Sequence, residues 1–172
     1  MLLRHFKAER PNKKWVTDVT GFNVAGGKLY LPPVTDLFNG ETVSCRIQTR
    51  PASDLAGKML KEAFKTLMPS EKPILHSDQG GQYRMPFYQQ QLKDKGLVQG
   101  MSRKGNCLDN AAVESFFGTL KPECFHTCKY ASVTELETAL HEYIHYYNHE
   151  RIKLKLKGLS PVQYRIQSLK TA

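Results

Sequence analysis

The first third of the chain alternates hydrophobic and polar residues with the period of two that strands require. Residues 13–24 alternate up to the turn Ala25-Gly26-Gly27, and residues 28–38 resume the alternation with an interruption at Pro32-Pro33. Residues 41–49 form a third run. Because proline lacks a backbone N–H, the proline pair requires an edge or a bulge. The pattern predicts three consecutive antiparallel strands.

The middle of the chain combines a helical period with short apolar runs. Residues 53–68 repeat apolar side chains every three or four positions behind Ser53, a favoured N-cap residue, and residues 86–95 form a second such segment. Residues 69–78 and 97–102 contain short apolar runs that predict buried strands. We expect the first of these to run parallel to the opening strand, because a helix connects it to the three-stranded segment. The order predicts a mixed α/β fold with five strands.

The last third of the chain is predicted to be mainly helical. One helix begins near Asn110 and is kinked or ended by Pro122, and residues 132–148 form a second helix with a tyrosine-bearing apolar face. Ser160-Pro161 supplies an N-cap and a first-turn proline for a short final helix. Between these helices, alternating apolar residues and lysines predict an extended segment over residues 151–157. Its basic edge consists of Lys153, Lys155 and Lys157.

The composition is that of one globular domain with a positively charged surface. The 172 residues are 40% hydrophobic, enough to bury a core, and we divide them into a basic N-terminal arm (1–12) and a core domain (13–172). The net charge of +9 favours a polyanionic partner, because each neutralised phosphate releases condensed counterions; a basic surface that only maintains solubility is the alternative. Four cysteines without a signal-like or membrane-length apolar segment indicate a reducing, intracellular setting.

Three acidic residues lie on otherwise structural elements. Asp18 lies within the first strand-like run, Asp78 ends the predicted fourth strand, and Glu114 lies in the early turns of a helix. Taken singly, each has a structural explanation: an edge-strand carboxylate facing water, a turn residue, or a charge at the positive end of a helix. Taken together, carboxylates without histidine or thiolate form the ligand set that magnesium prefers.

The residues around these acids, and two segments further along the chain, form short sequence motifs. They are Trp15-Val16-Thr17-Asp18, His76-Ser77-Asp78-Gln79-Gly80, Gly105-Asn106, Asp109-Asn110-Ala111, Tyr146-Tyr147-Asn148 and Gly158-Leu159-Ser160-Pro161. Thirty-five residues separate Asp78 from Glu114, and Lys121 follows seven residues after Glu114. In these motifs and in the spacing of the acids, nearly the whole chain resembles the catalytic core of transposases and retroviral integrases. The resemblance is in particular to the insertion-sequence-three group of bacterial transposases.

The resemblance implies a ribonuclease H-like fold: a five-stranded mixed sheet flanked by helices, with extra helices at the C-terminus. It implies a polynucleotidyl transferase, a transposase catalytic core over residues 13–172, that cleaves DNA and transfers strands during transposition and integration. Asp18, Asp78 and Glu114 would be the catalytic and metal-binding residues for Mg²⁺ or Mn²⁺, with two ions when DNA is bound.

The resemblance also implies partners and a location. The partners are double-stranded DNA, at the element ends and at the target, and further copies of the chain in a homo-oligomer when active; no membrane is implied. The implied location is the bacterial cytoplasm, in association with the nucleoid.

Several residues are predicted to contact DNA. In similar proteins the lysine at the position of Lys121 contacts the DNA end beside the site, although Pro122 disfavours helical geometry there. Asn106 either contacts DNA or orders the loop before Glu114. Lysines and arginines grip phosphates rather than bases. The full set is Lys121, Asn106, Arg103, Lys104, Lys153, Lys155 and Lys157. We expect Asp36, at the end of the second strand, to be structural, with an auxiliary metal role as the alternative.

Other functions stay open from the sequence alone. A ribonuclease H-like nuclease that only hydrolyses and a catalytically idle DNA-binding remnant are the two alternatives. Relatives carry an N-terminal helical DNA-recognition region, whereas this chain begins 17 residues before Asp18, so we do not expect sequence-specific recognition of element ends. The stretch His141-Glu142-Tyr143-Ile144-His145 matches the zinc-protease pattern, but the third zinc ligand of that class is missing.

Overall fold

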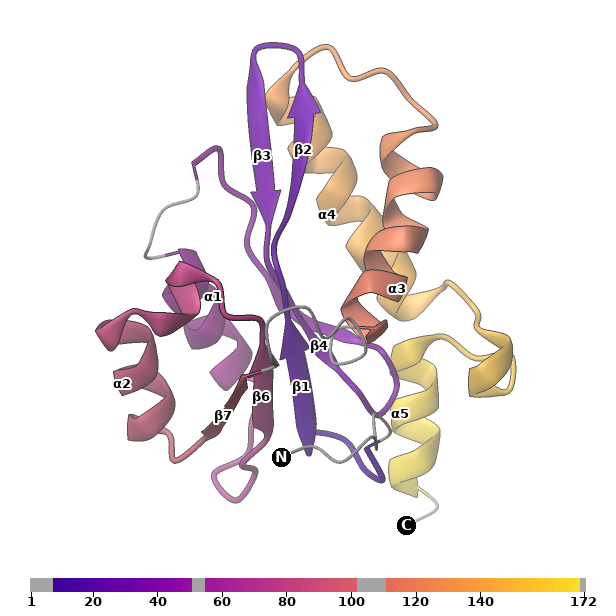
Figure 1. Ribbon diagram of the computed structural model, residues 1–172. Helices are drawn as coiled ribbons and strands as arrows, with labels where there is room; N and C mark the ends of the chain where they lie inside the picture. The colour runs from indigo at the N-terminus through magenta and orange to yellow at the C-terminus, as the bar shows by residue number, and fades with distance from the viewer. Residues whose placement is uncertain (1–7, 51–54, 102–110, 171–172) are drawn as a thin grey trace.

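A five-stranded mixed sheet forms the centre of the computed structural model, which describes residues 8–50, 55–101 and 111–170 (Figure 1). The strands lie in the order β5-β4-β1-β6-β7. Their bounds are β1 Lys14–Thr17, β4 Pro33–Asp36, β5 Thr42–Cys45, β6 Ile74–Ser77 and β7 Val98–Met101. β1 runs antiparallel to β4 and parallel to β6, and β6 runs parallel to β7. The predicted mixed sheet and the parallel fourth strand are confirmed.

The first two predicted strands are each divided in two, so their predicted extents were wrong. Residues 13–24 span β1 and β2 (Thr20–Val24), and β2 pairs in a separate hairpin with β3 (Gly27–Leu31). The break lies at Asp18, whose Oδ1 accepts the Val19 N–H at 2.7 Å. Pro32, which has no N–H to continue the ladder, separates β3 from β4. Because the period of two continues across both breaks, the alternation does not reveal them.

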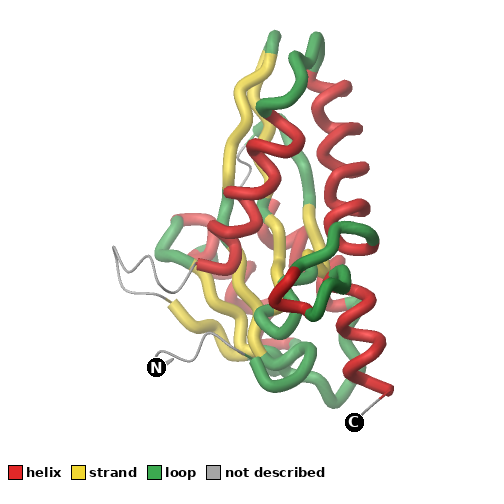
Figure 2. Tube along the Cα trace, turned by 90° about the vertical axis from the view of Figure 1, so that its right-hand side faces the viewer, coloured by secondary structure: helices red, strands yellow, loops and turns green. Residues whose placement is uncertain are grey.

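Alternate residues of β1 face two different helical layers. Trp15 packs in a core formed with α1 (Leu55–Phe64) and α2 (Pro86–Asp94). Its neighbour Val16 packs in a second core formed with α3 (Ala111–Leu120) and α4 (Val133–His149). Figure 1 shows α1 and α2 to one side of the sheet and α3 and α4 to the other, and Figure 2 shows the β2–β3 hairpin rising beside the α3 and α4 layer.

The helices of the C-terminal half begin and end largely as predicted. Ser132 caps α4, its Oγ accepting the Glu135 N–H at 3.1 Å. At Pro122 the chain widens into a π-turn, η3 (Lys121–Phe125), in which the His126 N–H bonds the Lys121 carbonyl at 2.8 Å. The predicted N-cap Ser53 and the helix start near Asn110 lie outside the described residues. No helix in the described ranges has both the length and the apolar character needed to cross a membrane.

Residues 151–157 are not extended, so this prediction was wrong. Lys153 makes one antiparallel bridge to Leu159, and Leu154–Leu156 form a 3₁₀ turn, η4. Lys157 closes the turn in the left-handed conformation, with φ of 59°. Within the turn Leu156 is buried while Leu154 is 94% exposed. The two leucines therefore do not share one buried face, as they would in a strand.

A buried ion pair fastens the last helix, α5 (Pro161–Lys170), to the sheet. The Arg165 guanidinium donates to Asp36 at 2.9 Å, to Glu41 at 2.6 Å and to the Asn12 Oδ1 at 2.7 Å. Asp36 is fully buried and also accepts the backbone N–H groups of Asn12 and Phe38. Burial raises the pKa of Asp36, although these hydrogen bonds and Arg165 oppose the shift. Through these contacts Asp36 links α5 to the sheet.

Candidate active site

Asp18 and Asp78 stand at the same level of two neighbouring parallel strands. Asp18 directly follows β1 and Asp78 directly follows β6, and the two strands pair with Lys14 opposite Ile74. Neighbouring strands lie about 4.8 Å apart. Both side chains are half-buried. The carboxyl ends of β1 and β6 therefore bring the two acids to one edge of the sheet.

Glu114 approaches this edge from the helical layer. It is exposed in the first turn of α3, while its neighbours Val113 and Phe116 are buried in the core that includes Val16 of β1. The burial of these two side chains fixes the helix on the sheet. The negative charge of Glu114 acts on Asp18, as does that of Asp78.

The electrostatics of Asp18 reflect both its burial and this gathering of acids. Burial is the main cause that raises the pKa of Asp18, and the Val19 N–H opposes it. The charges of Asp78 and Glu114 raise the pKa further. Such like-charge crowding is unfavourable without a cation.

The donor set fits a hard divalent cation such as Mg²⁺ or Mn²⁺, which prefers oxygen ligands. In the parts of the chain that the structure describes, no three His, Cys, Asp or Glu side chains stand together in a ready-made metal cage. The fit therefore rests on the chemistry of the three carboxylates and on the charge that they share at the sheet edge.

The turn after β6 holds the Asp78 carboxylate in place. Its Oδ1 accepts the Gly80 N–H at 2.9 Å. A Cβ atom on Gly80 would lie 2.8 Å from that oxygen and equally close to the Gln82 side chain. A larger residue at position 80 would therefore require the Asp78 and Gln82 side chains to shift.

Two buried residues beside the carboxylates were missed in the sequence. Tyr83, in the 3₁₀ turn η1 (Gly81–Arg84), is fully buried, and its hydroxyl lies 3.5 Å from the Thr17 Oγ1. Burial raises the pKa of Tyr83, and the negative charges of Asp18 and Asp78 raise it further. The Tyr83 hydroxyl therefore stays protonated beside the two carboxylates. Its position just after the Gly80-Gly81 turn is the sequence signal that would have indicated it.

The structure separates the predicted DNA-contacting residues into different environments. Lys121 is half-buried and starts η3, two helical turns beyond Glu114. Lys155, within η4, and Lys157, directly after it, are both exposed. Lys153 is not on an exposed edge, because its Nζ donates to the Tyr147 hydroxyl at 2.5 Å and lies 4.1 Å from the centre of that ring. The remaining predicted residues, Arg103, Lys104 and Asn106, lie outside the described residues, as do residues 1–7 of the arm.

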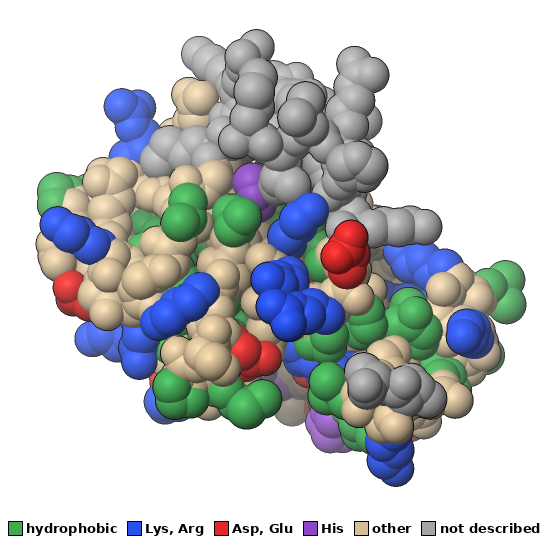
Figure 3. Space-filling model, turned by 90° about the horizontal axis from the view of Figure 1, so that it is seen from below, with side chains coloured by type: hydrophobic (Ala, Val, Ile, Leu, Met, Phe, Trp, Pro, Cys, Tyr) green, Lys and Arg blue, Asp and Glu red, His purple; other side chains and the backbone are tan. Residues whose placement is uncertain are grey.

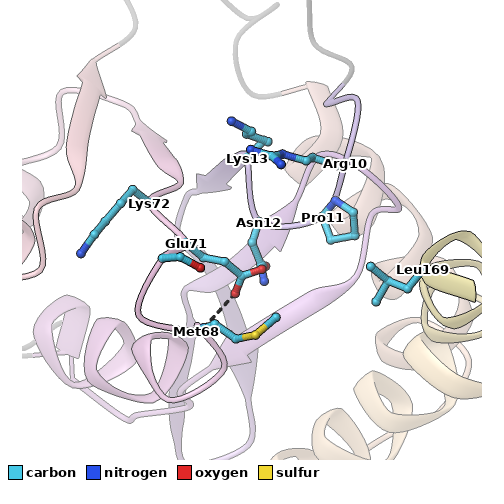
Figure 4. A pocket seen from close by; sticks show the side chains of 9 residues that line it. Arg10, Pro11, Asn12, Lys13, Met68, Glu71, Lys72 and Leu169 are labelled. Atoms are coloured by element: carbon cyan, nitrogen blue, oxygen red, sulfur yellow. Dashed lines mark hydrogen bonds between the residues drawn. The ribbon is translucent and has the colours of Figure 1, made fainter. Parts of the chain in front are cut away.

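A hollow of about 440 Å³ lies at the opposite end of the sheet, where β1 and β6 begin. Figure 3 shows lysine and arginine side chains spread over this face, and Figure 4 shows the residues lining the hollow. Two of its charged groups serve local structure: Glu71 accepts the Met68 N–H at 2.8 Å and Lys72 donates to the Lys95 carbonyl at 2.6 Å. Asp36 also lies at this end, opposite Trp15, which argues against an auxiliary metal role beside Asp18.

The zinc-protease pattern lies on α4 with its histidines turned away from the core. His141, Glu142 and His145 are exposed, whereas Tyr143 and Ile144 are buried. The histidines flank a core-facing tyrosine stripe, as expected. The described residues hold no third side chain that completes a zinc site with them.

Sequence comparisons identify the family models and the known proteins that this chain resembles. Models of the integrase core domain match residues 8–107 and residues 114–169. The chain is 60% identical over 168 residues to a putative transposase for insertion sequence element IS150 of Escherichia coli, covering 98% of this chain and 59% of that protein. It is 54% identical over 169 residues to an uncharacterized transposase-like protein of Haemophilus influenzae, covering 98% of this chain and 78% of that protein.

Solved structures share the fold at low sequence identity. The HTLV-2 integrase catalytic core domain in complex with magnesium, in its trimeric form, gives a TM-score of 0.72 at 19% identity, over 92% of this chain and 99% of that one. A chain of the simian T-cell lymphotropic virus intasome gives a TM-score of 0.72 at 22% identity, over 86% of this chain and 52% of that one. These likenesses confirm the ribonuclease H-like fold.

Proposed function

The chain belongs to the integrase core family, among the insertion-sequence transposases, and on this premise we propose that it performs metal-dependent DNA strand cleavage and strand transfer during transposition. The observation that carries the proposal is the meeting of Asp18 and Asp78 at adjacent strand ends, with the charge of Glu114 acting on Asp18. The magnesium complex of the similar HTLV-2 integrase core supports the choice of metal.

The three carboxylates divide the work of the site. Asp18, Asp78 and Glu114 would hold Mg²⁺ or Mn²⁺, and the metal would supply charge neutralisation at the reacting phosphodiester and activation of the attacking oxygen. The Val19 N–H holds one oxygen of Asp18, and the Gly80 N–H holds one oxygen of Asp78. The other oxygen of each carboxylate would bind the metal. Such preorganisation lowers the cost of assembling the site.

Neighbouring residues would position the site and the DNA. The fully buried Thr17 and Tyr83 side chains, whose hydroxyl oxygens are 3.5 Å apart, would keep water from the inner side of the strand ends. Lys121, two turns after Glu114, would contact a phosphate of the DNA end, where its positive charge would offset the phosphate charge.

The proposal predicts that Asp78→Asn abolishes metal-dependent cleavage and strand transfer while the fold survives. Losing one anionic ligand should lower the rate by at least about a hundredfold. Stability should hold or rise, because the substitution relieves repulsion with Asp18. The measurement is cleavage and joining of an element-end duplex with Mg²⁺ or Mn²⁺, together with denaturation of each purified protein.

Asp94→Asn is the matched control. Asp94 is an exposed acid on α2 whose carboxylate accepts the Gln90 amide, and its loss should leave the rate unchanged. An Asp78→Asn protein that reacts at the wild-type rate would exclude the assigned site. Wild-type protein that cleaves without joining would indicate a hydrolytic nuclease, and protein that binds DNA without cleaving would indicate an idle remnant.

The proposed partners are double-stranded DNA, at element ends and target, and further copies of the chain. The similar HTLV-2 integrase core is described in trimeric and dimeric forms, which supports a homo-oligomer as the active state. The relatives come from bacteria, and we place the protein with the bacterial nucleoid. Light scattering of the protein with and without an element-end duplex tests the oligomer.

A further inference from the structure

Three histidines follow one another at single-turn intervals along the outer side of α4. His141, His145 and His149 are four residues apart in sequence, and all three are exposed. Side chains four residues apart lie next to each other on a helix surface. The last two are already in contact, with ring centres 4.5 Å apart and an interplanar angle of 28°. The proposed transposition chemistry uses none of them.

This arrangement matches what a transition metal requires. Imidazole nitrogen is a preferred ligand of Zn²⁺, Ni²⁺ and Cu²⁺, and a pair of histidines one turn apart on a helix is the binding half of the zinc-protease pattern. Two nitrogens each about 2.1 Å from a metal are at most about 4.2 Å apart. The two ring centres are 4.5 Å apart, so the rings are close enough for chelation once side-chain rotation turns one nitrogen of each toward the ion.

The backbone beneath the pair is held rigid and ends favourably for a cation. Between the two histidines, Tyr147 is buried in the core and the Asn148 side chain makes two hydrogen bonds of 2.9 Å to the backbone of Thr42 in β5. His149 is the last residue of α4, where the helix dipole is negative. A bound cation would therefore gain from the dipole and order only two side chains.

We propose that His145 and His149 form a chelating site for a borderline divalent transition ion, represented by Zn²⁺, on the outer side of α4. Two imidazoles occupy two of the four positions of a tetrahedral ion, and water fills the others, so the ion binds reversibly. The site differs in chemistry from the carboxylates at the sheet edge, which prefer hard oxygen-loving ions. The inference stands independently of the proposed transposition, because both its ligands and its test lie outside that reaction.

The test is a Zn²⁺ titration of the full chain followed by calorimetry, in excess Mg²⁺ to occupy the carboxylates. Cys128→Ser serves as the background, which removes the exposed thiol near His126. His145→Gln should weaken Zn²⁺ binding by at least about tenfold, because losing a ligand costs no less than losing its supporting shell. His149→Gln should do the same. His141→Gln is the matched control and should change the affinity by less than about threefold.

The outcomes separate the assignments. His145→Gln protein that binds Zn²⁺ as tightly as its background would overturn the proposal. A large loss with His141→Gln and none with His149→Gln would also overturn it, because the ligands would then be the preceding pair. Since all three side chains are exposed, circular dichroism of each variant should match the background, and a failure to fold would not be mistaken for a lost ligand.

Discussion

At the scale of single residues, the motifs that carry the family resemblance contain both candidate site residues and residues with a structural role. Asp18 and Asp78 gather at one sheet edge, whereas Asn148 is a buried structural amide. Its Oδ1 accepts the Thr42 N–H and its Nδ2 donates to the Thr42 carbonyl, so it extends the hydrogen bonding of β5. Ser160 exchanges capping bonds with Gln163 at the start of α5. Part of the resemblance therefore identifies the fold and not the reaction.

Lys153 is a charged residue whose environment the sequence pattern did not predict. Burial lowers the pKa of Lys153 to about 7, and the positive charges of Lys155 and Arg151 lower it further. The Tyr147 hydroxyl and ring accept it. In the unfolded chain the pKa returns to about 10.5. Between these two values the unfolded state binds more protons, so stability rises with pH; below pH 7 the cost of the buried charge is fully present.

We predict that Lys153→Met removes this pH dependence. Methionine keeps the length and the apolar stem of the side chain but carries no proton. From pH 7.0 to 8.5 the wild type should gain stability relative to the variant, with a slope of at most about 1.4 kcal/mol per pH unit. Urea denaturation of both proteins across this window measures the difference, in which the thiols common to both cancel. A constant difference would show that Lys153 is not buried as described.

At the scale of elements, the sequence predicted types better than boundaries. The helices and the five strands of the main sheet were found because periods of 3.6 and two are local properties. The break at Asp18 was missed because β2 continues the same period while pairing in another sheet. The segment at Lys153 was misassigned because its alternation of leucine and lysine does not correspond to burial: Leu156 is buried and Leu154 is exposed in a 3₁₀ turn. Which sheet a strand joins is a tertiary fact that local period does not contain.

The attachment of α5 predicts a large effect of Arg165→Met. The variant leaves the buried Asp36 without its cation, which should cost about 3–5 kcal/mol. The double variant Asp36→Asn, Arg165→Met should recover part of this loss, because no uncompensated charge remains. Arg46→Met, which breaks an exposed pair with Glu62, is the control and should cost at most about 1 kcal/mol. Equal losses of unfolding free energy for Arg165→Met and Arg46→Met in chemical denaturation would show that the buried ion pair does not stabilise the attachment of α5.

The contact between β6 and β7 predicts that Gly100→Ala destabilises the fold. Gly100 pairs with the buried His76, and a Cβ atom there would lie 2.2 Å from the imidazole Cε1. Relieving the overlap moves the ring or the strand, at a cost of about 1–3 kcal/mol. His76 lies two residues before Asp78, so cleavage should fall as well.

Gly118→Ala is the control for this substitution. A Cβ atom on Gly118, inside α3, would meet nothing within 4 Å, and alanine should stabilise that helix by up to about 1 kcal/mol. Thermal denaturation of the two variants compares them directly. Opposite signs are expected, and a neutral Gly100→Ala would mean that the strands adjust freely.

At the scale of the whole molecule, a local gathering of acids contrasts with a positive net charge. Asp18 and Asp78 meet at the carboxyl ends of β1 and β6, whereas the chain as a whole carries a net charge of +9, and lysines and arginines are spread over the face seen in Figure 3. Spread cations grip the phosphate backbone and read no sequence. We therefore expect the core to bind DNA without sequence preference, and the carboxylates to act on any DNA end that is bound beside them.

The last prediction concerns this general grip on DNA. Binding of a duplex should be weak and sequence-independent, in the range of about 10⁻⁴–10⁻⁶ M at physiological salt, and should fall steeply as salt is added. Replacing the exposed Lys155 and Lys157 together with alanine should flatten the plot of log affinity against log salt by up to about 1.8, or about 0.9 for each lost phosphate contact. Lys153→Met should leave the slope unchanged, because its ammonium group is turned to Tyr147. Fluorescence anisotropy with scrambled and element-end duplexes over a salt series measures all three proteins. Tight, salt-insensitive binding confined to the element end would show that this core reads sequence, through contacts other than these lysines.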